Sequence, residues 1–123
     1  MDYKYQQITL DTIDTTDSRY RITTTQDKSP ISDSLRRIGL ISPVALKETD
    51  HRPIIVNGFR RVEACRQLGW TTLPCRVLPY HASFAECAEL SIADNIAQRS
   101  LNIVEQARCL RLLNDPRIGA HIS

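Results

Sequence analysis

The 123-residue sequence lacks the features that mark membrane, zinc-binding and disulfide-bonded proteins. No apolar run approaches the roughly 20 residues that a membrane helix needs, and the opening MDYKYQQ has no apolar signal-peptide core. The four cysteines are separated by ten, twelve and twenty-two positions, which leaves no close pair to hold zinc. We therefore expect a soluble cytoplasmic protein with no membrane partner, in which the cysteines are buried free thiols.

The sequence also lacks a strong charge of either sign, since its net charge is +2. Residues 1–50 carry seven basic and eight acidic side chains, whereas residues 51–123 carry nine and six. The basic excess of the second half is arginine, whose planar guanidinium suits phosphate. The net charge alone does not demonstrate a polyanion partner. The distribution of arginine nevertheless places the expected phosphate contacts in the second half.

The length suits one domain over residues 1–123, with its core at about 29–112. β-Prone runs predict strands at 8–10, 20–23, 44–46, 54–56 and 73–78, the last starting near a sheet edge because Pro74 cannot donate a hydrogen bond. Capping signals predict helices from Ser29-Pro30 to Gly39, from Phe59 to Gly69, from the box at residues 83–86, and from the box at 102–105 to Asp115-Pro116. The order predicts an α/β (α+β) fold, a small mixed β-sheet flanked by helices and followed by C-terminal helices.

The most informative segment is IIVNGFRR at residues 54–61. A buried strand there runs through Gly58 directly into the basic start of a helix. Helix N-termini present unpaired backbone N–H groups, and a glycine allows a phosphate to approach closely. Arg60 and Arg61 would add charge-assisted hydrogen bonds. Taken alone, this pattern is more typical of a strand-to-helix turn with two solvated arginines.

Three segments in order resemble the N-terminal domain of ParB-type chromosome and plasmid partition proteins, within the ParB/sulfiredoxin-like group. They are GLISPV at 39–44, GFRRVEA at 58–64 and DNIAQRSLN at 94–102. The resemblance implies a regulatory domain that binds a nucleoside triphosphate, CTP in the partition proteins, together with Mg²⁺. The residues that it implicates in nucleotide binding are Gly58, Phe59, Arg60, Arg61, Ser42, Asn95 and Gln98, with Asn95 also holding the metal.

The resemblance also carries expectations about activity and partners. The family's usual Gln, Glu and Arg are replaced here by Ser42, Phe59 and Gln98. We therefore expect binding with slow or absent hydrolysis, so that the domain is at most a weak CTPase. In partition proteins nucleotide binding promotes self-association around DNA, which implies a homodimer. Their helix-turn-helix lies downstream of this domain, so the chain is expected to be a fragment that meets DNA through the full-length protein, or else to act alone.

Two other functions stay open at this stage. One is an ATP- or ADP-dependent enzyme of the same fold. A sulfiredoxin-like enzyme needs a cysteine just before the turn, where Val56 and Asn57 stand, and no Asp, Glu and His cluster supports the nuclease label sometimes given to the family. A phosphotransferase would draw its base from Glu48, Asp50, Glu63 or Asp94. The other function is a non-catalytic DNA-binding module making salt-dependent backbone contacts through Arg36, Arg37, Arg60, Arg61, Arg66, Arg76, Arg99, Arg108 and Arg111.

Overall fold

The computed structural model describes residues 3–23, 43–98 and 101–117, with the side chains of 97 and 98 left out. The described chain forms one four-stranded mixed sheet in the order β1-β4-β2-β3. The strands are β1 (Lys4–Thr9), β2 (Val44–Lys47), β3 (Ile54–Asn57) and β4 (Thr72–Leu78). β1 pairs with β4 and β2 with β3 in antiparallel fashion, while β2 and β4 run parallel. The mixed sheet confirms that part of the predicted fold.

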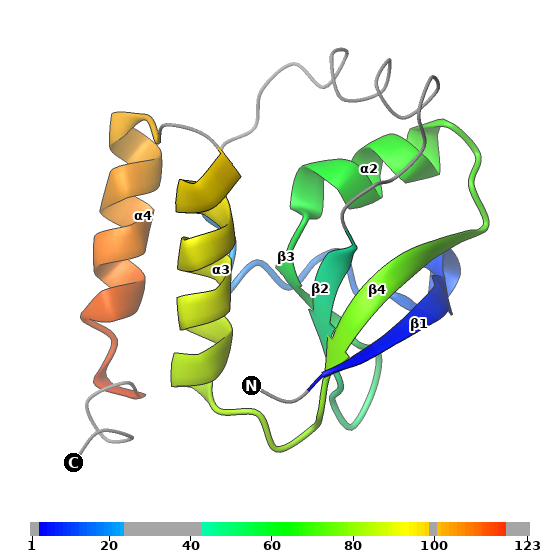
Figure 1. Ribbon diagram of the computed structural model, residues 1–123, viewed down its shortest axis with the longest axis horizontal. Coiled ribbons are helices and arrows are strands. Elements are labelled where there is room, and N and C mark those ends of the chain that lie inside the picture. Colours follow the sequence, from blue (N-terminus) through cyan, green and yellow to red (C-terminus); the bar gives the residue numbers. More distant parts are fainter. Residues whose placement is uncertain (1–2, 24–42, 99–100, 118–123) are drawn as a thin grey trace.

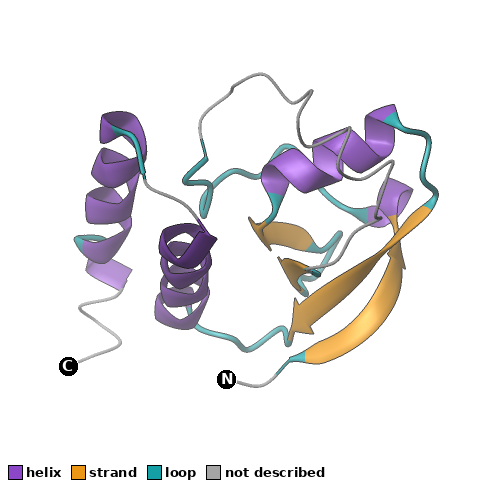
Figure 2. Ribbon diagram, turned by 45° about the horizontal axis from the view of Figure 1, so that its top comes forward, coloured by secondary structure: helices purple, strands orange, loops and turns teal. Residues whose placement is uncertain are grey.

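Side chains alternate between the two faces of the sheet, and each face builds its own core. Val44, Leu46, Ile55 and Cys75 join the cluster that packs under helix α2 (Phe59–Gln67). Ala45, Ile54, Val56 and Leu78 join the cluster that packs against helix α3 (Phe84–Gln98). Helix α4 (Ile103–Leu113) lies beyond α3, on the side away from the sheet (Figures 1 and 2). The sheet is therefore covered on both faces, as its apolar strands require.

The predicted capping boxes form at both C-terminal helices. The Ser83 hydroxyl accepts from the Glu86 amide at 3.1 Å, and the Glu86 carboxylate accepts from the Ser83 amide at 3.3 Å. Asn102 and Glu105 form the equivalent pair at the start of α4. Each box satisfies backbone donors that a helix start leaves open. No described helix has the combination of length and apolarity needed to cross a membrane.

The predicted strand at residues 20–23 is wrong. Tyr20 and Ile22 are 2% and 1% exposed, but they lie in a loop that packs against the C-terminal helices rather than on a sheet edge. The ring centroid of Tyr20 lies 5.1 Å from that of Phe84. Tyr20 joins the core between the sheet and α3, and Ile22 joins the core between α3 and α4. A β-prone pattern cannot distinguish such burial from strand pairing.

Two other strand predictions need adjustment, and one helix stays untested. β1 begins earlier than expected, at Lys4, and its end turns into a short 3₁₀ helix, η1 (Leu10–Thr12). β4 is an inner strand, although its pairing with β2 begins only at Cys75, so Pro74 has β1 as its single neighbour. The helix predicted from Ser29-Pro30 to Gly39 lies outside the described residues.

Candidate anion site at the Gly58 turn

Gly58 joins β3 to α2, and two features of its position require glycine. Its φ is +105°, in the left-handed region that other residues rarely adopt. A Cβ built on it would lie 2.5 Å from Cγ1 of Val44, far inside normal contact. β2 therefore packs directly against the backbone of the turn. The absence of a side chain at this point brings the N-terminus of α2 close to the end of the sheet.

The four residues predicted to bind phosphate at this turn are placed differently from one another. Phe59 is 4% exposed and belongs to the core under α2, with the guanidinium carbon of Arg21 lying 5.3 Å from its ring centroid. Only its backbone N–H is therefore available to an anion. Arg60 and Arg61 are half-buried instead of fully solvated, and Nη2 of Arg61 lies 3.3 Å from the position of a Cβ at Gly58.

A partly buried ion pair adjoins the turn. Nη2 of Arg76, in β4, lies 2.5 Å from Oδ2 of Asp94, in α3, and their side chains are 14% and 20% exposed. The same carboxylate oxygen accepts from Nδ2 of Asn57 at 3.0 Å. Nη2 of Arg76 also donates to the backbone carbonyl of Pro43 at 3.5 Å. These contacts tie β3, β4 and α3 together at one end of the sheet.

Arg61 belongs electrostatically to the same group. Burial lowers the pKa of Arg61, the nearby Arg76 guanidinium lowers it further, and Asp94 opposes the shift. We call Asn57, Arg61, Arg76 and Asp94 the Asp94 cluster. It holds two guanidinium groups and one carboxylate, so it carries one positive charge in excess beside the start of α2. That excess suits an anion.

Asn95 fastens α3 to the strand that carries the turn. Its side chain is 5% exposed, and its amide nitrogen donates to Oδ1 of Asn57 at 3.1 Å and to the carbonyl of Ser91 at 2.7 Å. The Ser91 hydroxyl in turn donates to the carbonyl of Tyr20 at 2.8 Å. The described contacts of Asn95 therefore position Asn57, immediately before Gly58.

The structure brings three of the seven predicted site residues to one place. Gly58, Arg61 and Asn95 meet around Asn57 and Asp94, whereas Ser42 and the side chain of Gln98 lie outside the described residues. Sequence reasoning missed Arg76 as a member of the site. Its signal is an arginine among the apolar residues of a strand, which indicates a buried partner when both faces of the sheet are covered.

A magnesium ion at Asn95, as the resemblance implies, does not suit the donor set. Mg²⁺ prefers carboxylate and phosphate oxygens in open octahedral geometry. Asp94 supplies the one carboxylate that the described contacts join to the cluster, and it is already paired with Arg76. In the described part of the chain, no three His, Cys, Asp or Glu side chains gather where they could hold a metal. A cation added here would meet two guanidinium groups.

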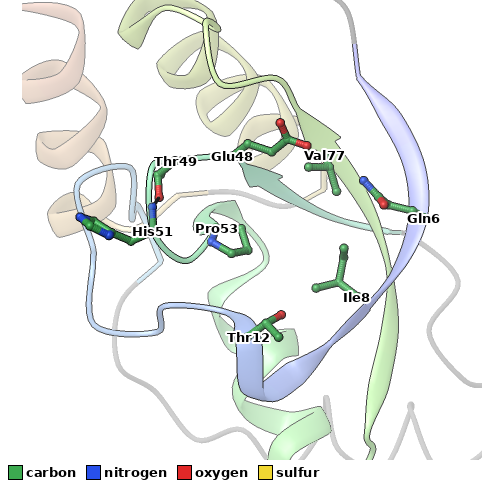
Figure 3. Close-up of a pocket in the computed structure, with 8 residues that line it drawn as sticks. All are labelled: Gln6, Ile8, Thr12, Glu48, Thr49, His51, Pro53 and Val77. Atoms are coloured by element: carbon green, nitrogen blue, oxygen red, sulfur yellow. Dashed lines mark hydrogen bonds between the residues drawn. The ribbon is translucent and has the colours of Figure 1, made fainter.

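A hollow of about 340 Å³ lies at the other end of the sheet (Figure 3). Ile8, Pro53 and Val77 supply its apolar surface, while Gln6, Thr12, Glu48, Thr49 and His51 surround it. In Figure 3 the ring of His51 points away from Ile8 and Val77. The hollow holds one acidic side chain and no arginine. It therefore lacks the charge that an anion needs.

The four cysteines are buried free thiols, as predicted. Burial raises the pKa of Cys65 and Cys87, and raises that of Cys75 to about 12. A nucleophilic cysteine needs the opposite shift. Val56 and Asn57 occupy the positions just before the turn where a sulfiredoxin-like mechanism needs its thiol. These side chains therefore serve packing.

The sequence matches a known protein family and several curated relatives. A sequence model of the ParB N-terminal domain matches residues 2–96. Over 113 residues the chain is 28% identical to a probable chromosome-partitioning protein ParB of Coxiella burnetii, covering 89% of this chain and 38% of the relative. The chain spans 26% to 38% of the length of curated relatives that it matches, which include a nucleoid occlusion protein of Halalkalibacterium halodurans.

Solved structures share the fold. The C-terminally truncated chromosome-partitioning protein ParB from Caulobacter crescentus, complexed with CTP-gamma-S, aligns with a TM-score of 0.65 and 20% identity over 92% of this chain and 64% of that one. Sulfiredoxin from Arabidopsis thaliana aligns with a TM-score of 0.52 and 30% identity over 62% of this chain and 85% of that one. The predicted ParB/sulfiredoxin-like fold class is confirmed.

Proposed function

Because this chain belongs to the ParB N-terminal domain family, we propose that it is a regulatory domain that binds a nucleoside triphosphate, with CTP as the first candidate. The phosphates would lie at the Gly58 turn, against the start of α2. The Caulobacter relative is complexed with a CTP analogue, which supports the choice of base. Through a longer protein, the domain would serve a DNA-associated partition assembly, in which nucleotide binding governs self-association.

The observation that carries this proposal is the excess of guanidinium charge beside the N-terminus of α2. The first N–H groups of an α-helix have no intrahelical partner and favour anions. Val44 fills the space that a side chain at Gly58 would take, and the half-buried Arg61 lies beside the turn. The side chains of Arg60 and Arg61 and the backbone N–H of Phe59 would contact phosphate, with Ser42 and Gln98 assigned to the site by the resemblance alone.

In this proposal Asn95 positions the Gly58 turn. It is buried and bonded to Asn57, so it would hold the turn in shape instead of reaching the phosphates. Hydrolysis would be slow or absent, since the family's acidic residue in the arginine segment is replaced by the buried Phe59. The domain would then act by binding, with self-association as its readout.

The test is a calorimetric titration of the purified chain with CTP, ATP, GTP and UTP, with Mg²⁺ and with a chelator, and again with a DNA duplex present. Tight binding of CTP with weaker binding of the other nucleotides is the expected result. A preference for ATP or ADP would favour an enzyme of the sulfiredoxin type. Binding of DNA without any nucleotide effect would favour a plain DNA-binding module.

A pair of arginine variants locates the site. Arg61→Ala removes a charged donor beside the turn and should weaken CTP binding about tenfold or more, because charge-assisted hydrogen bonds are strong. Arg66→Ala makes the same change on the exposed last turn of the same helix and should leave the affinity within about twofold. Thermal unfolding of both variants checks that the fold survives. Equal losses of affinity would place the phosphates elsewhere.

A further inference from the structure

Arg76 stands beside the one carboxylate of the Asp94 cluster. In the sheet, Arg76 of β4 pairs with Ala45 of β2, and Ala45 pairs with Asn57 of β3. One row of residues across the sheet therefore leads from Arg76 to the Gly58 turn. The Arg76 side chain is 14% exposed and lies between the sheet and α3. The Arg76 guanidinium is therefore held beside Asp94 and largely out of solvent.

The hydrogen bonds of Arg76 leave much of its donor capacity unused. Both described bonds start from the same terminal nitrogen, Nη2, and end at Asp94 and at the carbonyl of Pro43. Its buried Nε has no hydrogen-bond partner among the residues that the structure describes. An unsatisfied buried donor is costly, and a ligand oxygen is one group that would satisfy it.

The charges around Asp94 disfavour a metal and favour an anion. Arg61 and Arg76 together outweigh the single carboxylate, and the lowered pKa of Arg61 reflects both its burial and the proximity of Arg76. A divalent cation bound to Asp94 would lie close to a guanidinium held 2.5 Å from its Oδ2. A phosphate oxygen would instead relieve the repulsion between the two guanidinium groups.

We propose that triphosphate binding at this site needs no divalent cation, because Arg76 supplies beside Asp94 the positive charge that a metal ion would bring. The inference rests on the function proposed above. A free triphosphate is more negative than its magnesium complex. The site should therefore bind the metal-free nucleotide at least as tightly as the complexed one.

The decisive measurement is calorimetric titration of the wild-type chain with CTP in Mg²⁺ and in EDTA at matched ionic strength. Equal or tighter binding in EDTA supports the inference. Binding in Mg²⁺ that weakens about tenfold or more in EDTA overturns the inference and leaves the proposed function standing. Absence of binding in both buffers contradicts the proposed function itself, and the inference fails with it.

Arg76→Gln tests the residue, with Arg66→Gln as the matched control. We expect Arg76→Gln to weaken CTP binding about tenfold or more in EDTA and to recover part of the loss in Mg²⁺, because Asp94 is then released to meet a cation. Arg66→Gln should behave as the wild type in both buffers. Unchanged CTP binding by a folded Arg76→Gln protein would overturn the role of Arg76. If the variant fails to fold, the wild-type titration still decides.

Discussion

The two ends of strand β3 carry opposite kinds of surface. Pro53, just before the strand, faces a hollow of about 340 Å³ that is lined by a mixture of apolar and polar side chains with one carboxylate. Asn57, its last residue, belongs to a tightly packed cluster of two guanidinium groups and a carboxylate. The described hollow therefore lies away from the charged groups. The phosphate site proposed for this protein rests on buried charge and not on empty volume.

The largest expected loss of stability comes from a substitution of Gly58, at the charged end of β3. Gly58→Ala should lower the free energy of unfolding by roughly 3 kcal/mol or more, because it combines a positive φ with a Cβ driven into Val44. Gly69→Ala is the matched control, since its φ is +81° but a Cβ there meets nothing within 4 Å. It should cost about 1–2 kcal/mol from backbone strain alone. Urea denaturation of both variants measures the difference, and equal costs would show that contact with Val44 is unimportant.

The next effect compares side-chain hydrogen bonds at the two ends. Asn95→Ala removes buried bonds to Asn57 and Ser91 and should cost about 1–3 kcal/mol of stability. Thr49→Ala removes the hydroxyl that donates to the carbonyl of Arg52 at 2.7 Å, beside the hollow. It should lower the free energy of unfolding by about 0.5–1 kcal/mol. Urea denaturation at neutral pH is again the measurement. A costlier Thr49→Ala would reverse the comparison and make the hairpin the more rigid end.

The smallest expected effect concerns the apolar layer behind the charged end, where Cys75 stands next to Arg76 in β4. Burial raises the pKa of Cys75 from 9.0 to about 12, so the folded state keeps the thiol protonated where the unfolded state ionises it. This contribution to stability is complete below pH 9 and is lost as the pH rises toward 12. At pH 10.5 the loss should be on the order of 1–2 kcal/mol.

Denaturation in reductant at pH 8 and pH 10.5 measures that loss, with Cys75→Ala as its reference. The variant should lose less stability between the two pH values than the wild type does. An identical alkaline loss in both proteins would mean that water reaches the thiol, and that the layer behind the cluster is looser than the structure shows.

Local signals were enough to predict most of the described framework. Ser83 with Glu86, Asn102 with Glu105, and Gly58 each act within a few residues, so the sequence reveals them directly. The run at 20–23 was misassigned because its burial depends on strands and helices that are distant in the sequence. Local pattern cannot tell which distant surface a buried run will cover.

The part of the candidate site that lies in one segment was predictable, and the part that depends on distant residues was not. The turn and its arginines lie in one segment, whereas the pairing of Arg76 with Asp94 joins residues 18 positions apart on different elements. Alternation along β4 indicates that Arg76 faces away from Cys75, but only the packing of α3 on that face shows that the side chain is enclosed. The enclosed guanidinium in turn changes the expectation about the metal.

The two constraints on Gly58 have a consequence for the genetics of the domain. Shortening Val44 to alanine would remove the clash that a new side chain at position 58 creates, but it would leave the backbone strain in place. Conversely, no change at a neighbouring side chain relaxes a positive φ. A selection for second-site suppressors of Gly58→Ala should therefore return true revertants far more often than single compensating mutations.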